Sequence, residues 1–171
     1  MNEGRTVFAQ LMDQLPKYEL DKCIVPYGGN RRMRSFSTYE QFLTMAFAQL
    51  TYRESLRDIA TCLHAVGPKL YHSGLRHPVA RSTLADANEK RDWRIFADFA
   101  QVLIQQALTL YSDEPFGVEL KKDAYALDST TINLCLSLFS WAKFRRHKAA
   151  IILHTPTHLP SNFLPGIIVH T

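Results

Sequence analysis

The segment DAYALDSTTI, residues 123–132, predicts a buried β-strand. Its large side chains, Tyr125 and Leu127, alternate with alanines, which is typical of a strand covered on both faces. We expect the strand to end at Asp128, which three hydroxyl side chains follow. A carboxylate at the end of a buried strand is unfavourable unless a divalent metal ion, an Arg or a Lys meets it. Asp128 is therefore the first candidate functional residue, and its alternative role is to cap a turn through its own Ser and Thr neighbours.

The chain on the two sides of this strand has different patterns. Residues 1–113 show helical periodicity, and the pattern becomes extended after a Pro- and Gly-containing break at residues 112–117. We predict an α+β fold, with an all-helical N-terminal domain over residues 1–113 and the first strands of a sheet over residues 118–171. Further strands are predicted at residues 149–155 and 167–171, with a proline-rich turn over residues 156–165 between them.

Capping residues and apolar spacing predict five helices. Ser37 and Glu40 form a capping box, and Gly67 followed by proline marks a helix end. Residues 17–36 are expected to be irregular. The predicted helices cover residues 3–15 with Asn2 as cap, 38–50, 56–66, 83–88 with Ser82 as cap, and 92–111. On the helix at residues 38–50, the side chains expected to face inward are Phe42, Met45, Ala46, Gln49 and Leu50.

The composition indicates a protein with a packed core. Of 171 residues, 46% are hydrophobic and 21% are charged, which argues against disorder. No apolar run reaches the roughly 18 residues that a membrane span needs, and the N-terminus lacks a signal-peptide pattern. We expect a cytoplasmic, nucleoid-associated protein. Its three cysteines, Cys23, Cys62 and Cys135, are far apart and are predicted to be reduced, mostly buried thiols.

The net charge of +4 is concentrated near the predicted strand. Residues 1–118 carry 14 Lys and Arg against 13 Asp and Glu, whereas residues 119–148 carry six against three. Such a local excess suits a polyanionic partner. The basic side chains of the stretch at residues 141–148 are Lys143, Arg145, Arg146 and Lys148. They form either a solvated face or a grip on a phosphate backbone beside Asp128.

Two groups of polar residues in the helical part are candidates for DNA contact. Arg31, Arg32 and Arg34 form either a solvated loop or an arm that contacts phosphates, since Arg forks suit phosphate oxygens. The helices that begin after Ser55 and Ser82 are expected to pack together, either simply or as a long-linked helix-turn-helix. If the second helix reads DNA, the side chains to test are Thr83, Asn88, Lys90 and Arg91.

Several separated segments together resemble a known family. The chain contains, in this order, the segments RSFSTYEQFLTMAFAQLTYRESLRDIATCL, RSTLADANEKRDWRIFADFA and YALDSTTINLCLSLFSWAKFRRHKAAIILHT. They resemble transposases of bacterial insertion sequences. The likeness is to the DDE superfamily and, within it, to the family named after the fourth catalogued insertion sequence. It covers most of residues 4–155.

The resemblance implies an RNase H-like catalytic domain in which three acids bind two Mg²⁺ or Mn²⁺ ions. Asp128 matches the first acid, so the resemblance makes it both a catalytic residue and a metal ligand. Such metals activate a water or a 3′-hydroxyl for attack at phosphorus. The implied partners are the DNA of transposon ends, a second copy of the chain, or a full-length transposase.

The sequence departs from the family at the other two acids. No residue here matches them, and Glu119 and Asp123 precede Asp128 too closely to take those roles. One carboxylate does not hold two metals about 3.5–4 Å apart. His154 and His158 flank a proline in an extended segment, which argues against metal binding. We therefore expect a transposase cut short by truncation or a frameshift and inactive alone, or a non-catalytic DNA-binding regulator or inhibitor of transposition.

Overall fold

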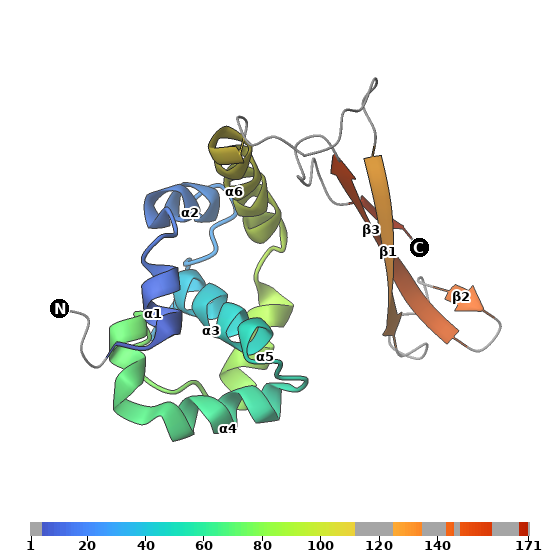
Figure 1. The fold of residues 1–171 in the computed structure, drawn as a ribbon. Coiled ribbons are helices and arrows are strands. Elements are labelled where there is room, and N and C mark those ends of the chain that lie inside the picture. Colours follow the sequence, from blue (N-terminus) through green and yellow to red (C-terminus); the bar gives the residue numbers. More distant parts are fainter. Residues whose placement is uncertain (1–4, 112–124, 135–142, 146–147, 159–167, 171) are drawn as a thin grey trace. The chain divides into compact units, whose positions relative to one another are not determined.

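Helices come first in this chain and strands follow, as the computed structural model shows (Figure 1). The structure describes residues 5–111, 125–134, 143–145, 148–158 and 168–170. The fold class is α+β, as predicted. The chain forms two compact units, Met1–Phe99 and Ala100–Thr171. The break predicted at residues 112–117 lies outside the described residues.

The first unit is built from short helices joined by tight connections. Those wholly inside it are α1 (Val7–Met12), α2 (Lys17–Ile24), α3 (Thr38–Leu50), α4 (Leu56–Val66), the 3₁₀ helix η1 (Gly67–Ser73) and α5 (Arg81–Lys90). The longer α6 (Arg94–Tyr111) begins in this unit. The predicted capping box is confirmed, since the Ser37 hydroxyl accepts from Glu40 N at 3.1 Å and the Glu40 carboxylate accepts from Ser37 N at 2.8 Å.

Three predictions about helix starts are wrong. Residues 17–24 are helical, because Pro16 suits a helix start and Leu20, Cys23 and Ile24 place a buried stripe at helical spacing. The cap of α1 is Thr6, whose hydroxyl accepts from Ala9 N. Ser82 lies inside α5, which begins after Ala80. A hydroxyl residue near a helix start does not cap it unless its backbone leaves the helix.

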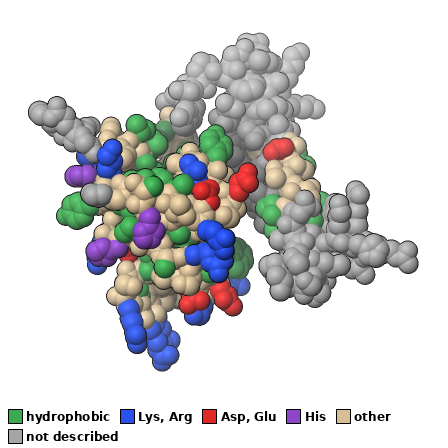
Figure 2. All heavy atoms as spheres, turned by 90° about the horizontal axis from the view of Figure 1, so that it is seen from below, with side chains coloured by type: hydrophobic (Ala, Val, Ile, Leu, Met, Phe, Trp, Pro, Cys, Tyr) green, Lys and Arg blue, Asp and Glu red, His purple; other side chains and the backbone are tan. Residues whose placement is uncertain are grey.

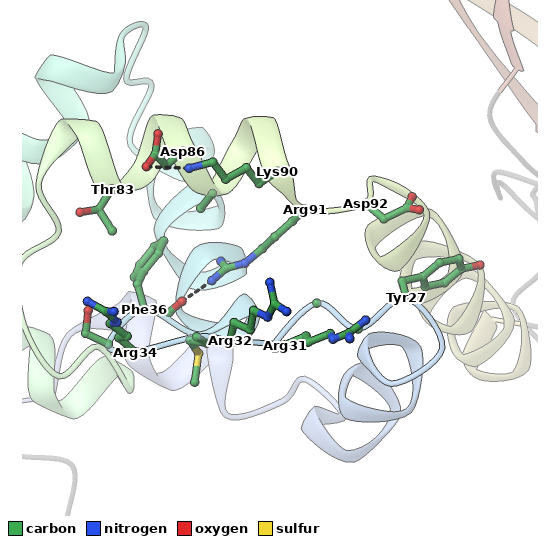
Figure 3. Close-up of a pocket in the computed structure, with 15 residues that line it drawn as sticks. Tyr27, Arg31, Arg32, Arg34, Phe36, Thr83, Asp86, Lys90, Arg91 and Asp92 are labelled. Atoms are coloured by element: carbon green, nitrogen blue, oxygen red, sulfur yellow. Dashed lines mark hydrogen bonds and ion pairs between the residues drawn. The ribbon is translucent and has the colours of Figure 1, made fainter.

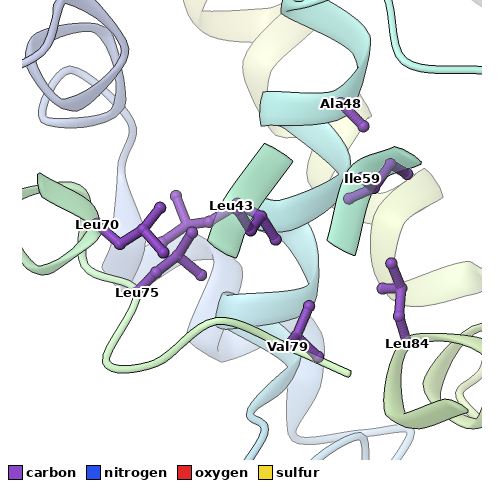
Figure 4. Close-up of a cluster of buried hydrophobic side chains, with 8 residues drawn as sticks. Leu43, Ala48, Ile59, Leu70, Leu75, Val79 and Leu84 are labelled. Carbon is purple, nitrogen blue, oxygen red and sulfur yellow. The ribbon is translucent and has the colours of Figure 1, made fainter. Parts of the chain in front are cut away.

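One apolar cluster joins α3, α4, η1 and α5 (Figure 4). Leu43 and Leu84 are 0% exposed, and Ile59 and Leu63 of α4 lie with them in the cluster. The predicted packing of the two helices after Ser55 and near Ser82 is thereby confirmed. Leu70, Leu75 and Val79 belong to the same cluster, so the long connection between α4 and α5 contributes to the core.

The buried face of α3 is not the predicted one. Leu43 and Ala48 are buried, whereas Met45 is 38% and Leu50 is 53% exposed. The polar Thr38, Gln41 and Thr44 are buried as well. Since α3 packs on both α2 and α5, the side that these helices cover is the one buried. Periodicity identified an apolar stripe but not which side its neighbours occupy.

The strands of the second unit pair in antiparallel fashion. They are β1 (Tyr125–Leu134), β2 (Lys143–Arg145), β3 (Lys148–His158) and β4 (Ile168–His170). β1, β2 and β4 each pair with β3. Strands are therefore present at residues 125–134, 148–158 and 168–170, close to the predicted ones. The sequence segment at residues 135–142 lies outside the described residues.

Two expectations for the sheet are corrected. The strand does not end at Asp128 and is not buried at its centre, because Leu127 is 63% and Ile132 is 41% exposed. Among the described strands β1 pairs only with β3. Pro156 belongs to β3 opposite Leu127, rather than to a turn. A proline is tolerated there because the pairing of β3 with β4 stops at His154, which leaves Pro156 one described neighbour strand.

Cys23 and Cys62 are free thiols, as predicted; Cys23 is buried and Cys62 is half-buried. Burial raises the pKa of the Cys23 thiol, which keeps it protonated and unreactive. Cys135 lies outside the described residues. Among the helices that the structure describes, none has both the length and the apolar character needed to cross a membrane.

Candidate nucleic-acid interface

A cavity of about 350 Å³ lies between the turn at residues 27–36 and helix α5 (Figure 3). The turn supplies Arg31, Arg32 and Arg34, and α5 supplies Thr83, Asp86 and Lys90. We call it the basic cavity. Its residues are Tyr27, Gly28, Gly29, Arg31, Arg32, Met33, Arg34, Ser35, Phe36, Thr83, Asp86, Ala87, Lys90, Arg91 and Asp92. The two groups predicted separately as DNA contacts thus lie at one site, except for Asn88.

Glycine lets the turn lie close to the core. Gly28 has φ +61°, a conformation that L residues rarely adopt. A Cβ on Gly29 would lie 2.6 Å from Ile95 Cδ1 and 2.9 Å from Thr38 Oγ1, so only glycine fits there without displacement. The turn signal predicted from Tyr27 to Asn30 is confirmed.

Side chains anchor both ends of the turn. The Tyr27 hydroxyl donates to Asp98 Oδ2 at 2.8 Å, and this hydrogen bond raises the Tyr27 pKa. Thr38 N donates to Asn30 Oδ1 at 2.9 Å, which joins the turn to the start of α3. Asn30 precedes the three arginines and Thr38 follows them, so their hydrogen bond holds the backbone on both sides of the arginines.

The Arg91 side chain makes hydrogen bonds within the first unit and is not free in solvent. Its guanidinium donates to the carbonyl oxygens of Phe36 and Ser37 and to Gln41 Oε1, the last at 2.8 Å. It also stacks over the Phe36 ring, 5.4 Å from the centroid. Burial lowers the Arg91 pKa, yet an Arg side chain stays charged in proteins. These bonds give Arg91 a structural role, which is to hold the turn against α3, and its DNA contact stays a prediction.

The other α5 residues predicted as DNA contacts differ in whether their side chains already have partners within the protein. Lys90 forms an exposed ion pair with Asp86 at 3.1 Å, which water weakens. Asn88 accepts from Gln41 Nε2 at 2.6 Å and faces a different cavity. Thr83 lies in the basic cavity and is half-buried. Asp86 was not identified from sequence, although its spacing of four from Lys90 on a helix was a usable signal.

The three arginines of the turn are the available cations of the basic cavity. Arg31, Arg32 and Arg34 are exposed, and within the described residues their side chains have no ion pair or hydrogen bond. The cavity has five cationic side chains and two acidic ones, Asp86 and Asp92. On the face drawn in Figure 2, Lys and Arg lie among Asp and Glu side chains. Within the basic cavity, three of the five cationic side chains come from the turn.

Among the described residues of the second unit, neither an ion-pair partner nor a metal-binding cluster meets Asp128. Asp128 is an exposed residue in the interior of β1, opposite Thr155. Of the nearby histidines, His154 shares a 2.9 Å hydrogen bond with Ser129. Among the described residues no group of three His, Cys, Asp or Glu could hold a metal ion. The residues described do not fit a two-metal centre.

The described basic residues of the second unit, Lys143, Arg145 and Lys148, lie away from Asp128. The sheet register pairs Arg145 with Lys148 and Lys143 with Ala149, whereas Asp128 pairs with Thr155. Seven residues of strand separate Lys148 from Thr155, which is about 23 Å. The expected grip beside Asp128 is therefore wrong in its location. Arg146 lies outside the described residues, as do Trp141 and His147.

One comparison with known proteins found a match. Residues 3–76 match a family described as a domain of unknown function (DUF4372). This range includes α1 to α4 and the turn that carries the three arginines. No curated protein matches the chain. No solved structure matches it either.

Proposed function

We propose that this protein binds DNA through the basic cavity, as a member of the transposase group that its sequence resembles. The observation that carries the proposal is the meeting of Arg31, Arg32 and Arg34 with Thr83 and Lys90 at one cavity. These two groups are separated by about 50 residues in the sequence, and each is a candidate DNA contact by its residue types.

The chemistry of the cavity suits a phosphate backbone. Planar guanidinium groups bind phosphate oxygens through two parallel hydrogen bonds. The three exposed arginines have donors available, and Arg91 holds their turn in place. Contacts of this kind position a protein on DNA without reading bases. Transposon-end DNA is accordingly the proposed partner, and base selection requires further contacts.

Replacing Arg31, Arg32 and Arg34 together with Gln is the test of this proposal. If each arginine neutralises one phosphate, the slope of log affinity against log salt falls by about 2.7, and binding at low salt weakens by at least about tenfold. Electrophoretic shift with insertion-sequence end DNA across a salt series measures both quantities. The matched control changes Arg57, Arg76 and Arg81 to Gln, since none of these lines the basic cavity. Equal losses in the two variants would contradict the proposal.

Asp128 supports a second candidate function, a non-catalytic DNA-binding regulator. In the proposed transposase ancestry Asp128 is one of three metal-binding acids, but no residue of this sequence matches the other two. We expect the purified 171-residue chain to bind DNA without cutting it in Mg²⁺ or Mn²⁺. A supercoiled-plasmid nicking assay checks this. Nicking that is lost in Asp128→Asn would contradict the regulator and favour an active transposase.

A further inference from the structure

A second cavity adjoins the basic cavity in the first unit. It has a volume of about 500 Å³ and lies between α3 and the start of α6. Its apolar lining includes Phe42, Met45, Trp93 and Phe96. We call it the aromatic groove. Arg91 lines both the basic cavity and the aromatic groove, so this side chain borders the two sites.

The aromatic groove leaves large apolar surface open to water. Trp93 is 68% exposed and Met45 is 38% exposed. The Arg94 guanidinium lies 5.3 Å from the Trp93 ring centroid, and Phe42 packs edge-on against buried Phe99 at 5.3 Å. Phe42 thus packs against the core, whereas Trp93 stays largely exposed although Arg94 lies over one face of its ring. The apolar spacing of α3 predicts instead that Phe42 and Met45 face the core.

Amide side chains border the same groove. Gln49 lines it, and within the described residues its side chain has no hydrogen-bond partner. The Asn88 amide nitrogen has only a weak contact there, 3.9 Å from Met45 Sδ. Gln49 therefore has a free donor and a free acceptor side by side, which is the pattern that pairs with the edge of a base. Asn88 adds only its amide nitrogen, because its amide oxygen accepts from Gln41 Nε2 at 2.6 Å. A purely apolar partner would leave these groups unpaired.

We propose that the aromatic groove binds an unpaired nucleobase of the strand whose phosphates lie in the basic cavity. Trp93 stacks on the base, and Gln49 and Asn88 face its polar edge. Stacking on aromatic side chains beside a cationic backbone track is how proteins hold single-stranded nucleic acid. The inference rests on the proposed function, because the basic cavity supplies the phosphate contacts that bring the base to the groove.

Fluorescence of Trp93 tests the inference directly. The sequence has two tryptophans, so Trp141→Phe leaves Trp93 as the only indole. This variant of the full chain is titrated with three labelled oligonucleotides of equal length: single-stranded DNA, the same strand with an abasic stretch, and a duplex. Label anisotropy reports total binding, and indole emission reports stacking. We expect quenching by the single strand, with little or none from the abasic strand or the duplex.

Substitution of the indole supplies the second measurement. Trp93→Ala is expected to weaken single-strand binding by about fivefold to a hundredfold and to leave duplex binding within about twofold. Tyr18→Ala is the control, because Tyr18 is 71% exposed and does not line the groove. Thermal unfolding of both variants verifies that they fold. A change that is equal for the two DNA forms, or equal in Tyr18→Ala, would overturn the assignment.

The outcomes separate this inference from the proposed function. DNA binding that depends on Arg31, Arg32 and Arg34 but gives no Trp93 quenching overturns the base site and leaves the proposed function standing. Absence of DNA binding overturns both. Trp93 emission that shifts with protein concentration in the absence of DNA shows that a second copy covers the groove, which also overturns the base site.

Discussion

Arg91→Met is expected to lower the free energy of unfolding of the helical unit by about 3 kcal/mol. The substitution keeps much of the side-chain volume but removes the donors to the Phe36 and Ser37 carbonyls and to the Gln41 amide. The buried Gln41 amide and the half-buried Phe36 and Ser37 carbonyls then lose a charged partner. Urea unfolding of the full chain, followed by the helical circular dichroism signal, measures the change.

Two further variants isolate the cause. Arg91→Lys keeps the charge but loses the planar fork, so we expect about half of the destabilisation. Arg94→Met removes a neighbouring arginine whose side chain is 57% exposed, and it is expected to cost less than about 0.5 kcal/mol. If Arg91→Met unfolds at the same urea concentration as the unchanged protein, the hydrogen bonds of Arg91 do not stabilise the helical unit.

Leu43→Ala is expected to lower the free energy of unfolding by about 3 kcal/mol, within the usual range of about 2–5 kcal/mol for a fully buried leucine. Leu43 is 0% exposed in the cluster that joins α3 to α4, η1 and α5. Removing its side chain leaves a cavity in this cluster, which the surrounding helices close only in part. The same urea experiment provides the measurement.

The control on the same helix is Leu50→Ala. Leu50 is 53% exposed, so its replacement by Ala is expected to lower the free energy of unfolding by less than about 1 kcal/mol. The periodicity of α3 had predicted Leu50 as an inward residue, and the structure reverses this. Equal costs at Leu43 and Leu50, or a larger cost at Leu50, would show that the predicted face is the buried one.

Short-range signals predicted much of the fold. The capping box at Ser37 and Glu40 and the glycine at Gly67 marked helix ends correctly, since each acts through hydrogen bonds within one turn of helix. The strands at residues 148–158 and 168–170 were predicted from apolar runs. α2 was missed because its apolar stripe is short and directly follows Pro16.

The candidate site was predicted in composition but not in geometry. The basic runs identified Arg31, Arg32 and Arg34, and also Lys143, Arg145 and Lys148. Sheet register then separated the second group from Asp128, because Thr155 rather than Lys148 lies opposite the carboxylate. A pattern of charges along the chain carries no information about which strand residues face each other.

The amino-acid sequence by itself determined the α+β class and the starts of α3 and α4. Only the tertiary structure decided which arginines remain free. Arg91 reaches the Phe36 carbonyl across 55 residues of sequence and becomes an internal support, whereas Arg31, Arg32 and Arg34 stay exposed. The physical reason is that caps and turns depend on neighbours along the chain, while the surroundings of a side chain depend on helices that meet only after folding.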